Sequence, residues 1–246
     1  MSLPVHWVPS LDDAEVGTTI EVTGDEAHHA VAVRRLRVGE SVVLTEGRGR
    51  AVTGPVTTTG KRAFSLEVAS LSDSPAPSPS VTVVQAIPKG DRGELAVEML
   101  TEVGVARVVP WAASRSVAVW KGERTAKSLA KWRTTAREAS KQARRSWFAE
   151  VGDLSSTADV EALVAEADLA VVLHEAATLS LSDLDVPGSG SVVVVVGPEG
   201  GLSDEEVAAF EAAGARVVRL GAEVLRTSTA GVAAVAALLS RTPRWA

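Results

Sequence analysis

From residue 81 onward, apolar runs that fit strands alternate with segments of helical periodicity. Residues 192–196 are five consecutive valines, and an unbroken β-branched run fits a strand buried on both faces, as in a parallel sheet. The alternation of strands and helices favours an α/β fold built on such a sheet. Further strands are predicted at 81–87, 107–111, 168–173 and 217–220, and helices at 93–103, 121–145, 158–167, after Ser203, and at 230–239.

The first 70 residues have a different pattern, in which short runs alternate between apolar and polar positions. Glycine-containing turns separate these runs, which predicts a small β-rich unit, interpreted as a barrel. Between the first two runs, residues 25–38 have a roughly helical pattern with Ala27, Val31 and Leu36 as inward positions. The predicted strands are 19–22, 41–44, 51–56 and 64–68.

A proline- and serine-rich stretch separates the two patterns. Three prolines alternate with small residues in 73–80, which favours an extended, semi-rigid linker. We therefore predict a small domain at 1–72, a linker at 73–80 and an α/β domain at 81–246.

Composition narrows the class of protein. A length of 246 residues suits one large or two modest domains, and 46% hydrophobic residues can fill a sizeable core. The absence of cysteine excludes disulfides, thiolate metal sites and cysteine nucleophiles. The first ten residues do not resemble a signal peptide, and no apolar run approaches the ~20 residues of a membrane span. A cytoplasmic protein without a membrane segment or a metal is expected.

Charge is segregated along the chain despite a net charge of -6. Residues 121–150 contain nine basic and three acidic residues, and residues 28–62 contain seven and two. Two basic zones on an acidic protein are compatible with a polyanionic partner such as nucleic acid. The alternative is that 121–145 is simply a solvated helix.

Two loops near the C-terminus are the strongest candidates for a binding site. Residues 197–201 form a glycine loop after the valine strand, but they match neither a Walker A motif nor a dinucleotide fingerprint. Within this loop, Glu199 places a carboxylate beside exposed backbone N–H groups. Residues 225–230 form a second, polar loop with Arg226, where Ser228 or Thr229 could also cap the next helix. Loops that leave the same edge of a parallel sheet make a crevice, which is where α/β folds bind ligands.

The other candidate residues are less specific. His28 and His29 suit a surface or structural role better than a metal site, because no carboxylates with ligand spacing accompany them. Lys89, Arg92 and Arg115 follow strands whose ends share the rim of the crevice, where they could meet substrate phosphates or be ordinary surface charges. Ser203 and Glu206 form a predicted capping box at the start of a helix.

The motifs of both loops resemble one known family. The first is Val195-Val196-Gly197-Pro198-Glu199-Gly200-Gly201-Leu202-Ser203, and the second is Leu220-Gly221, then Leu225-Arg226-Thr227 and Thr229-Ala230. With Lys89-Gly90-Asp91-Arg92, Ser114-Arg115-Ser116 and residues of 29–39, 101–105 and 132–142, they resemble the RsmE family over nearly the whole chain. Members of this family are bacterial methyltransferases that act on N3 of a uridine in 16S ribosomal RNA.

The resemblance implies a fold, a cofactor and partners. It implies a C-terminal SPOUT fold with a trefoil knot around S-adenosyl-L-methionine, an N-terminal PUA-like β-barrel that holds RNA, and a homodimer with each cofactor pocket near the partner subunit. The substrate would be 16S rRNA within the small ribosomal subunit. The implied cofactor-binding residues are Leu173, His174, Glu175, Val196, Gly197, Pro198, Glu199, Gly200, Gly201, Leu220, Gly221, Leu225, Arg226, Thr227, Thr229 and Ala230.

Methylation of uridine N3 suggests roles for two residues. N3 carries a proton at neutral pH, so we hypothesise that Arg226 polarises or orients the base and that Glu199 fixes the loop or accepts a proton. RNA contacts are expected from His29, Arg34, Arg35, Arg37, Lys89, Arg92 and Arg115.

The chain departs from the family pattern at two positions. Arg34 adds a charge, and Ser228 stands where an acidic residue is often found. Two other functions remain open at this point, which are a non-catalytic RNA-binding module and an α/β enzyme acting on a small molecule.

Overall fold

The computed structural model describes residues 3–245 and divides the chain into two compact units. The first comprises Met1–Ala76 and Lys141–Phe148, and the second comprises Pro77–Ser140 and Ala149–Ala246. The chain thus passes between the units inside the stretch predicted as a linker. The assignment of Lys141–Phe148 to the first unit differs from the continuous second domain expected from the sequence, because this segment hydrogen-bonds to the loop around Gly47 and Gly49.

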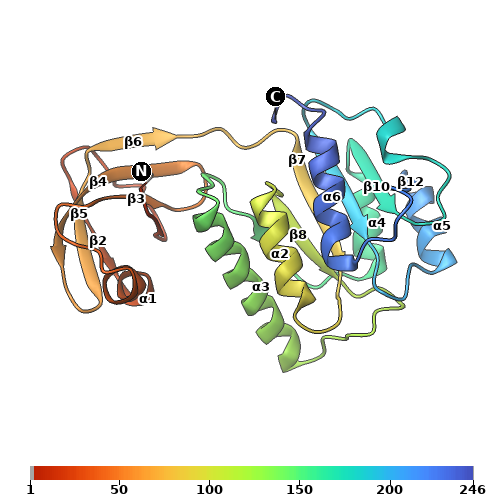
Figure 1. Cartoon of the computed structure of the whole chain (residues 1–246), viewed down its shortest axis with the longest axis horizontal. Coiled ribbons are helices and arrows are strands. Elements are labelled where there is room, and N and C mark those ends of the chain that lie inside the picture. Colours follow the sequence, from red (N-terminus) through yellow and green to blue (C-terminus); the bar gives the residue numbers. More distant parts are fainter. Residues whose placement is uncertain (1–2, 246) are drawn as a thin grey trace. The chain divides into compact units, whose positions relative to one another are not determined.

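The second unit is built on a six-stranded, wholly parallel sheet in the order β12-β10-β11-β7-β8-β9 (Figure 1). The valine strand β11 lies at its centre, between β10 and β7, as its sequence predicted. The strands are β7 (Ser80–Ala86), β8 (Arg107–Trp111), β9 (Glu150–Val151), β10 (Leu169–Leu173), β11 (Ser191–Val196) and β12 (Arg216–Val218). The helices are α2 (Arg92–Glu102), α3 (Glu123–Gln142), whose last two residues belong to the first unit, α4 (Thr157–Ala165), α5 (Asp204–Ala212) and α6 (Thr227–Leu239), with a 3₁₀ turn at Leu181–Asp183.

Helices cover both faces of this sheet, which explains the run of valines. Val192, Val194 and Val196 pack in one core cluster with residues of α2 and α6, whereas Val193 and Val195 pack in another with residues of α4 and α5. Successive side chains of a strand point to opposite faces, so a strand between two helical layers must be apolar at every position. The α/β class predicted from the sequence is therefore confirmed.

The start of α6 differs from the prediction. The helix begins at Thr227 with Arg226 as its N-cap, and no side chain supplies the cap hydrogen bond. The expected cap by Ser228 or Thr229 is wrong, because both residues already lie within the first turn. Ser228 is buried, and the hydroxyl of Thr229 donates back to the carbonyl of Arg226 at 3.1 Å.

The first unit is a mixed sheet in the order β1-β3-β4-β5-β2, with β6 paired to β4. All four predicted strands are present, while β1 and β6 were not anticipated. Ala27 and Leu36 are buried as predicted, and Val31 is half-buried. The strands are β1 (Val5–Trp7), β2 (Thr19–Thr23), β3 (Ser41–Thr45), β4 (Arg50–Thr59), β5 (Ala63–Glu67) and β6 (Ser70–Asp73), and α1 (Gly24–His28) continues into a π-helix at His29–Val33.

No helix among residues 3–245 is long and apolar enough to cross a membrane. Within the same residues, no group of three or more His, Cys, Asp or Glu side chains is arranged to hold a metal ion.

Candidate active site

A cavity of about 680 Å³ lies where β10, β11 and β12 end at the carboxyl edge of the sheet. Its walls are the glycine loop after β11, the end of β10 and the segment from β12 to α6. The predicted crevice between the two loops is therefore present. The predicted residues that line it are Leu173, His174, Glu175, Val196, Gly197, Pro198, Glu199, Gly200, Gly201, Leu220, Gly221, Leu225, Arg226, Thr227 and Ala230, together with Arg92 and Arg115.

Sequence reasoning missed several residues that line the cavity, and it included one that does not. Thr229 is outside the lining, because its hydroxyl is held on the Arg226 carbonyl. Of the missed residues, Asp204 had a usable signal, because it follows the glycine loop closely. Arg219 had none, because it fell inside the strand predicted at 217–220, whereas β12 ends at Val218. The missed residues are Leu202, Asp204, Arg219, Glu223 and Val224.

The glycine loop has its shape for local reasons. The N–H of Gly201 donates to the carbonyl of Pro198 at 3.0 Å, and Gly201 has a φ of 73°, a conformation that favours glycine. A Cβ at Gly200 would lie 2.8 Å from the carbonyl oxygen of Arg115, so this position has no room for a side chain. The loop thus passes close to the backbone after β8, which lies two strands away from β11 in the sheet.

A capping box at the start of α5 follows the glycine loop, as predicted. The Ser203 hydroxyl accepts from the N–H of Glu206, and the Glu206 carboxylate accepts from the N–H of Ser203 at 2.9 Å. The same carboxylate accepts from the N–H of Ser114 at 2.7 Å, and Nη1 of Arg115 donates to the Leu202 carbonyl at 2.9 Å. Glu206 is buried, so these bonds fix the loop 114–116 against the start of α5.

Buried hydrogen bonds join the glycine loop 197–201 to the second predicted loop, 225–230. The hydroxyl of Thr227 donates to the carbonyl of Gly197 at 3.3 Å. From β7, the fully buried amide of Gln85 donates to the carbonyls of Thr227 at 3.3 Å and Ala86 at 3.2 Å. Because an isolated buried amide is costly, these bonds define the position of α6 against the sheet.

The cavity is lined by charges of both signs. The Glu199 carboxylate accepts from the N–H of Lys89 at 3.1 Å, which ties the glycine loop to the loop after β7. Nδ1 of His174 accepts from the N–H of Ala176 at 3.1 Å, so a neutral His174 ring carries its proton on Nε2. The lining charges are the arginines Arg92, Arg115, Arg219 and Arg226 and the carboxylates Glu175, Glu199, Asp204 and Glu223.

The predicted RNA contacts of the first unit gather around its π-helix. The N–H of Arg34 donates to the carbonyl of His29 at 3.0 Å, and Arg35 has a φ of 58°. His29, Arg34, Arg35 and Arg37 are all exposed. Non-glycine residues with positive φ and π-helical turns are both uncommon and cluster at functional sites.

Comparisons with known proteins agree for both units. A family model for an RNA methyltransferase domain matches residues 75–239, and one for an RNA methyltransferase PUA domain matches residues 22–69. "Ribosomal RNA small subunit methyltransferase E" of Mycobacterium tuberculosis is 42% identical, covering 98% of this chain and 93% of the relative. The protein of the same name in Bacillus subtilis is 28% identical over 93% of this chain and 92% of the relative.

Two solved structures have the same fold over nearly the full length. The methyltransferase E of Neisseria gonorrhoeae bound to S-adenosyl methionine has a TM-score of 0.86 and 28% identity, covering 97% of this chain and 98% of that one. A putative methyltransferase of Legionella pneumophila in complex with the same cofactor has a TM-score of 0.88 and 27% identity, covering 98% and 99%. These findings confirm the resemblance seen in the motifs. The chain belongs to the family of ribosomal RNA small subunit methyltransferase E.

Proposed function

We propose that this protein transfers the methyl group of S-adenosylmethionine to N3 of a uridine in 16S rRNA of the small ribosomal subunit. The observation that carries the proposal is the cavity formed by the two motif loops, in a chain whose fold matches cofactor-bound methyltransferases over nearly its full length. A cytoplasmic location follows from this substrate in bacteria.

The chemistry of the cavity lining fits the cofactor. A volume of about 680 Å³ lies within the usual range for small-molecule sites. Leu173, Leu220 and Leu225 offer apolar surface for an adenine ring, and the carboxylates of Glu175 and Glu223 are suited to hydroxyl and ammonium groups. When bound, S-adenosylmethionine supplies an electrophilic methyl group carried by a sulfonium.

The residues of this chain have to handle the proton and the charge of the uracil ring. N3 becomes nucleophilic as it loses its proton, and negative charge then develops on the two neighbouring carbonyl oxygens. A guanidinium can stabilise that charge, which is the role proposed for Arg226. Glu199 can accept the N3 proton, and its bond to the N–H of Lys89 also fixes the loop.

The proposed fold of the second unit is the SPOUT type, with a trefoil knot. Support comes from the segment 174–190, which contacts the chain both before and after α6. Before α6, the N–H of Arg219 donates to the carbonyl of Leu179 at 2.8 Å. After α6, the guanidinium of Arg241 donates to the carbonyls of Leu181 and Leu184. Such contacts on two sides are expected where a C-terminal helix threads through a loop.

A homodimer is the proposed assembly, with a second copy beside the cofactor pocket. Val224 and Leu225, at the mouth of the cavity, are 75% and 41% exposed. Neighbouring exposed apolar side chains at a functional site mark surfaces that other molecules cover. The proposed barrel of the first unit, with its exposed arginines, would hold the RNA, in line with its match to the PUA model.

Removing the positive charges near the π-helix is expected to weaken RNA binding and to reduce its dependence on salt. Each arginine that contacts a phosphate adds about one unit to the slope of log affinity against log salt concentration. We therefore expect the triple variant Arg34→Ala, Arg35→Ala and Arg37→Ala to lower the magnitude of this slope by about 3. The measurement is filter binding of 16S rRNA at salt concentrations from about 50 to about 200 mM. Arg216→Ala, which removes an exposed positive charge outside this surface, is the control, and an unchanged slope in the triple variant would rule out this RNA surface.

The proposed reaction is tested by methyl transfer from labelled S-adenosylmethionine to small ribosomal subunits that lack the modification. The expected result is label on N3 of one uridine, identified by mass spectrometry of the digested rRNA. Cofactor binding without transfer to any ribosomal RNA would reject the proposed substrate. Transfer to a small molecule in the absence of RNA, or RNA binding with no affinity for the cofactor, would favour the two alternative functions.

A further inference from the structure

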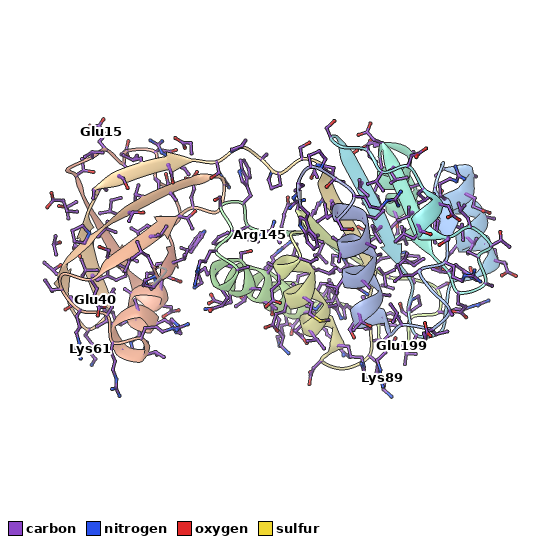
Figure 2. The ribbon with its side chains drawn as sticks, turned by 45° about the horizontal axis from the view of Figure 1, so that its top comes forward. Glu15, Glu40, Lys61, Lys89, Arg145 and Glu199 are labelled. Carbon is purple, nitrogen blue, oxygen red and sulfur yellow. The ribbon has the colours of Figure 1, made fainter. Side chains whose placement is uncertain are left out.

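A second hollow, of about 770 Å³, lies next to the cofactor cavity. It is formed by the loop after β7, the first turn of α2 and the glycine loop. Figure 2 shows Lys89 and Glu199 at the same edge of the unit. Six residues line the hollow, namely Lys89, Gly90, Asp91, Arg92, Leu95 and Glu199, and of these Arg92 and Glu199 also line the cofactor cavity.

The position of this hollow is built into the fold. Ile87 and Pro88 are buried, and the bond from the N–H of Lys89 to Glu199 holds the loop 88–91 against the glycine loop. Gly90 has a φ of 67°, which allows the tight turn before α2 begins at Arg92. Glu199 and Arg92 therefore stand at the boundary between the two hollows.

The lining combines three kinds of chemistry. Leu95 presents an apolar side chain that is 44% exposed, although it lies among charged neighbours. Half-buried Arg92 and exposed Lys89 are cations, and Glu199 is a hydrogen-bond acceptor. A phosphate group alone would gain nothing from Leu95 and would be repelled by Glu199 and Asp91, so a simple phosphate subsite does not explain this set.

A uracil ring matches all three features. It has apolar faces, and along one edge an N3–H donor lies between two carbonyl acceptors. An acceptor that shares a lining with cations complements that edge, and a leucine can pack against the ring face. Enzymes that modify a base generally take it out of its stack and into a pocket of this kind.

We propose that the hollow of Lys89, Arg92, Leu95 and Glu199 receives the target uracil, turned out of the RNA. Leu95 packs against the ring, Arg92 faces a carbonyl oxygen, and Glu199 faces N3 at the boundary with the methyl donor. As the bond from N3 to the methyl carbon forms, the bond from that carbon to sulfur breaks, the N3 proton passes to Glu199, and the sulfonium becomes a neutral thioether. This inference rests on the proposed methyltransferase function.

The first test compares Leu95→Ala with Val117→Ala, because Val117 is also an exposed apolar residue but lines neither hollow. Loss of apolar contact in a binding pocket commonly costs about tenfold or more in specificity. We expect Leu95→Ala to lower kcat/KM for unmethylated small subunits by at least about tenfold, with the affinity for S-adenosylmethionine unchanged by calorimetry. Val117→Ala should retain the wild-type values of both.

A direct test places 4-thiouridine at the modified position of the subunit and irradiates the complex. The expected crosslink lies within residues 89–95. An active wild type with no effect of Leu95→Ala and crosslinks only elsewhere would overturn the subsite while leaving the methyltransferase function intact. A change from dimer to monomer in Leu95→Ala, measured by light scattering, would instead assign the hollow to the interface between copies. A wild type that methylates no RNA would overturn both proposals.

Discussion

Replacing Arg226 by alanine is expected to slow methyl transfer by about 10²–10³-fold at saturating substrate. Loss of one preorganised group that stabilises developing negative charge has an effect of this size in other enzymes. In the proposed reaction the charge develops on the carbonyl oxygens of uracil, next to N3. The measurement is a single-turnover rate with labelled S-adenosylmethionine and unmethylated small subunits.

The structure indicates that this substitution will not disturb the fold. The backbone carbonyl of Arg226 accepts from the N–H groups of Thr229 and Ala230 at 2.8 and 2.9 Å, and alanine would keep both bonds. Within residues 3–245, the exposed guanidinium has no hydrogen-bond or ion-pair partner. The side chain therefore lines the cavity without a structural role. Its removal should lower the rate of methyl transfer and leave the stability of the fold unchanged.

Two further variants separate charge from geometry. Arg226→Lys keeps the positive charge but lacks the planar fork of donors, so an intermediate rate is expected. Arg216→Ala is the matched control, since Arg216 is an exposed arginine on β12 that does not line the cavity. A full methylation rate in Arg226→Ala would reject a role for this residue in the reaction.

The second unit could be predicted closely because its signals are local. An unbroken run of valines predicts a strand between two layers, and the structure places such layers on both faces of β11. The capping box of Ser203 and Glu206 needs only residues three apart. For the same reason both loops of the cavity could be located from glycine, proline and strand ends alone.

Features that depend on distant residues could not be predicted in this way. Strand β1 pairs in parallel with β3, which places Val5 beside Val43. The residues near Val5 in the sequence do not predict this pairing. The return of Lys141–Phe148 to the first unit depends on contacts with residues almost 100 positions earlier. The start of α6 was predicted too late because the polar residues of its first turn have the composition of a loop. Their helical position depends on the distant Gln85 amide, which donates to the carbonyl of Thr227.

The same limit explains the missed residues of the site. Glu223 and Val224 lie in a segment with no secondary-structure signal, and their proximity to the cavity depends on where β12 and α6 lie. Charge alone did not mark them either, since exposed acidic residues are frequent in 151–246. Such positions become visible only when the elements on each side are placed in space.

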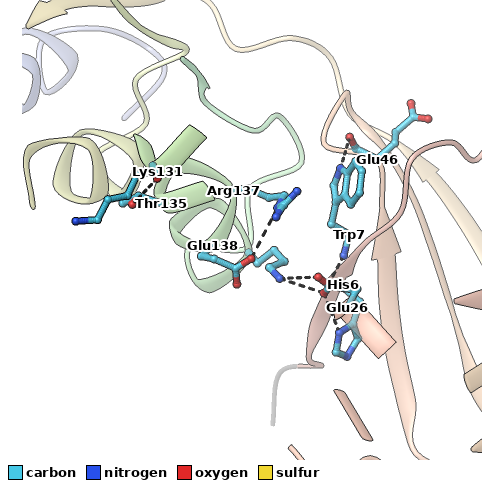
Figure 3. Close-up of polar contacts among 9 residues, drawn as sticks. His6, Trp7, Glu26, Glu46, Lys131, Thr135, Arg137 and Glu138 are labelled. Atoms are coloured by element: carbon cyan, nitrogen blue, oxygen red, sulfur yellow. Dashed lines mark hydrogen bonds and ion pairs between the residues drawn. The ribbon is translucent and has the colours of Figure 1, made fainter. Parts of the chain in front are cut away.

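A half-buried carboxylate in the first unit also escaped the sequence analysis. Glu26 accepts from Nζ of Lys141 at 2.9 and 3.1 Å and from the N–H of Trp7 at 3.2 Å, and Nδ1 of His6 lies 3.2 Å from it. Figure 3 shows Glu26 between His6 and Trp7. The side chains of Glu26 and Lys141 are only 15% and 6% exposed. This cluster ties the C-terminal end of α3 to β1 and α1 within one unit.

Replacing Glu26 by glutamine is expected to destabilise the first unit by about 3–5 kcal/mol. Removing one member of a buried ion pair has a cost of this order, because the remaining ammonium of Lys141 loses the Glu26 charge while it stays out of water. The double variant Glu26→Leu with Lys141→Met should recover part of the loss, since an apolar pair avoids the buried charge but leaves the N–H of Trp7 without its acceptor. Urea unfolding at pH 7, followed by tryptophan fluorescence, measures both, and Glu67→Gln, at an exposed carboxylate, is the matched control.

The pH dependence gives a separate test of the same cluster. Burial alone would raise the pKa of Glu26, but hydrogen bonds from His6 and Lys141, the charge of Lys141 and the N–H of Trp7 outweigh it and lower this pKa from 4.5 to about 2. A carboxyl with a lowered pKa in the folded state stabilises the protein fully above its unfolded value, near 4.5, and this contribution declines as the pH falls toward about 2. As the pH falls from about 5 to about 3, the free energy of unfolding of the wild type should therefore fall more steeply than that of Glu26→Gln. This pH range starts just above the unfolded pKa of Glu26 and ends between its unfolded and folded pKa values. Parallel curves for the two proteins would show that Glu26 does not carry this part of the acid sensitivity.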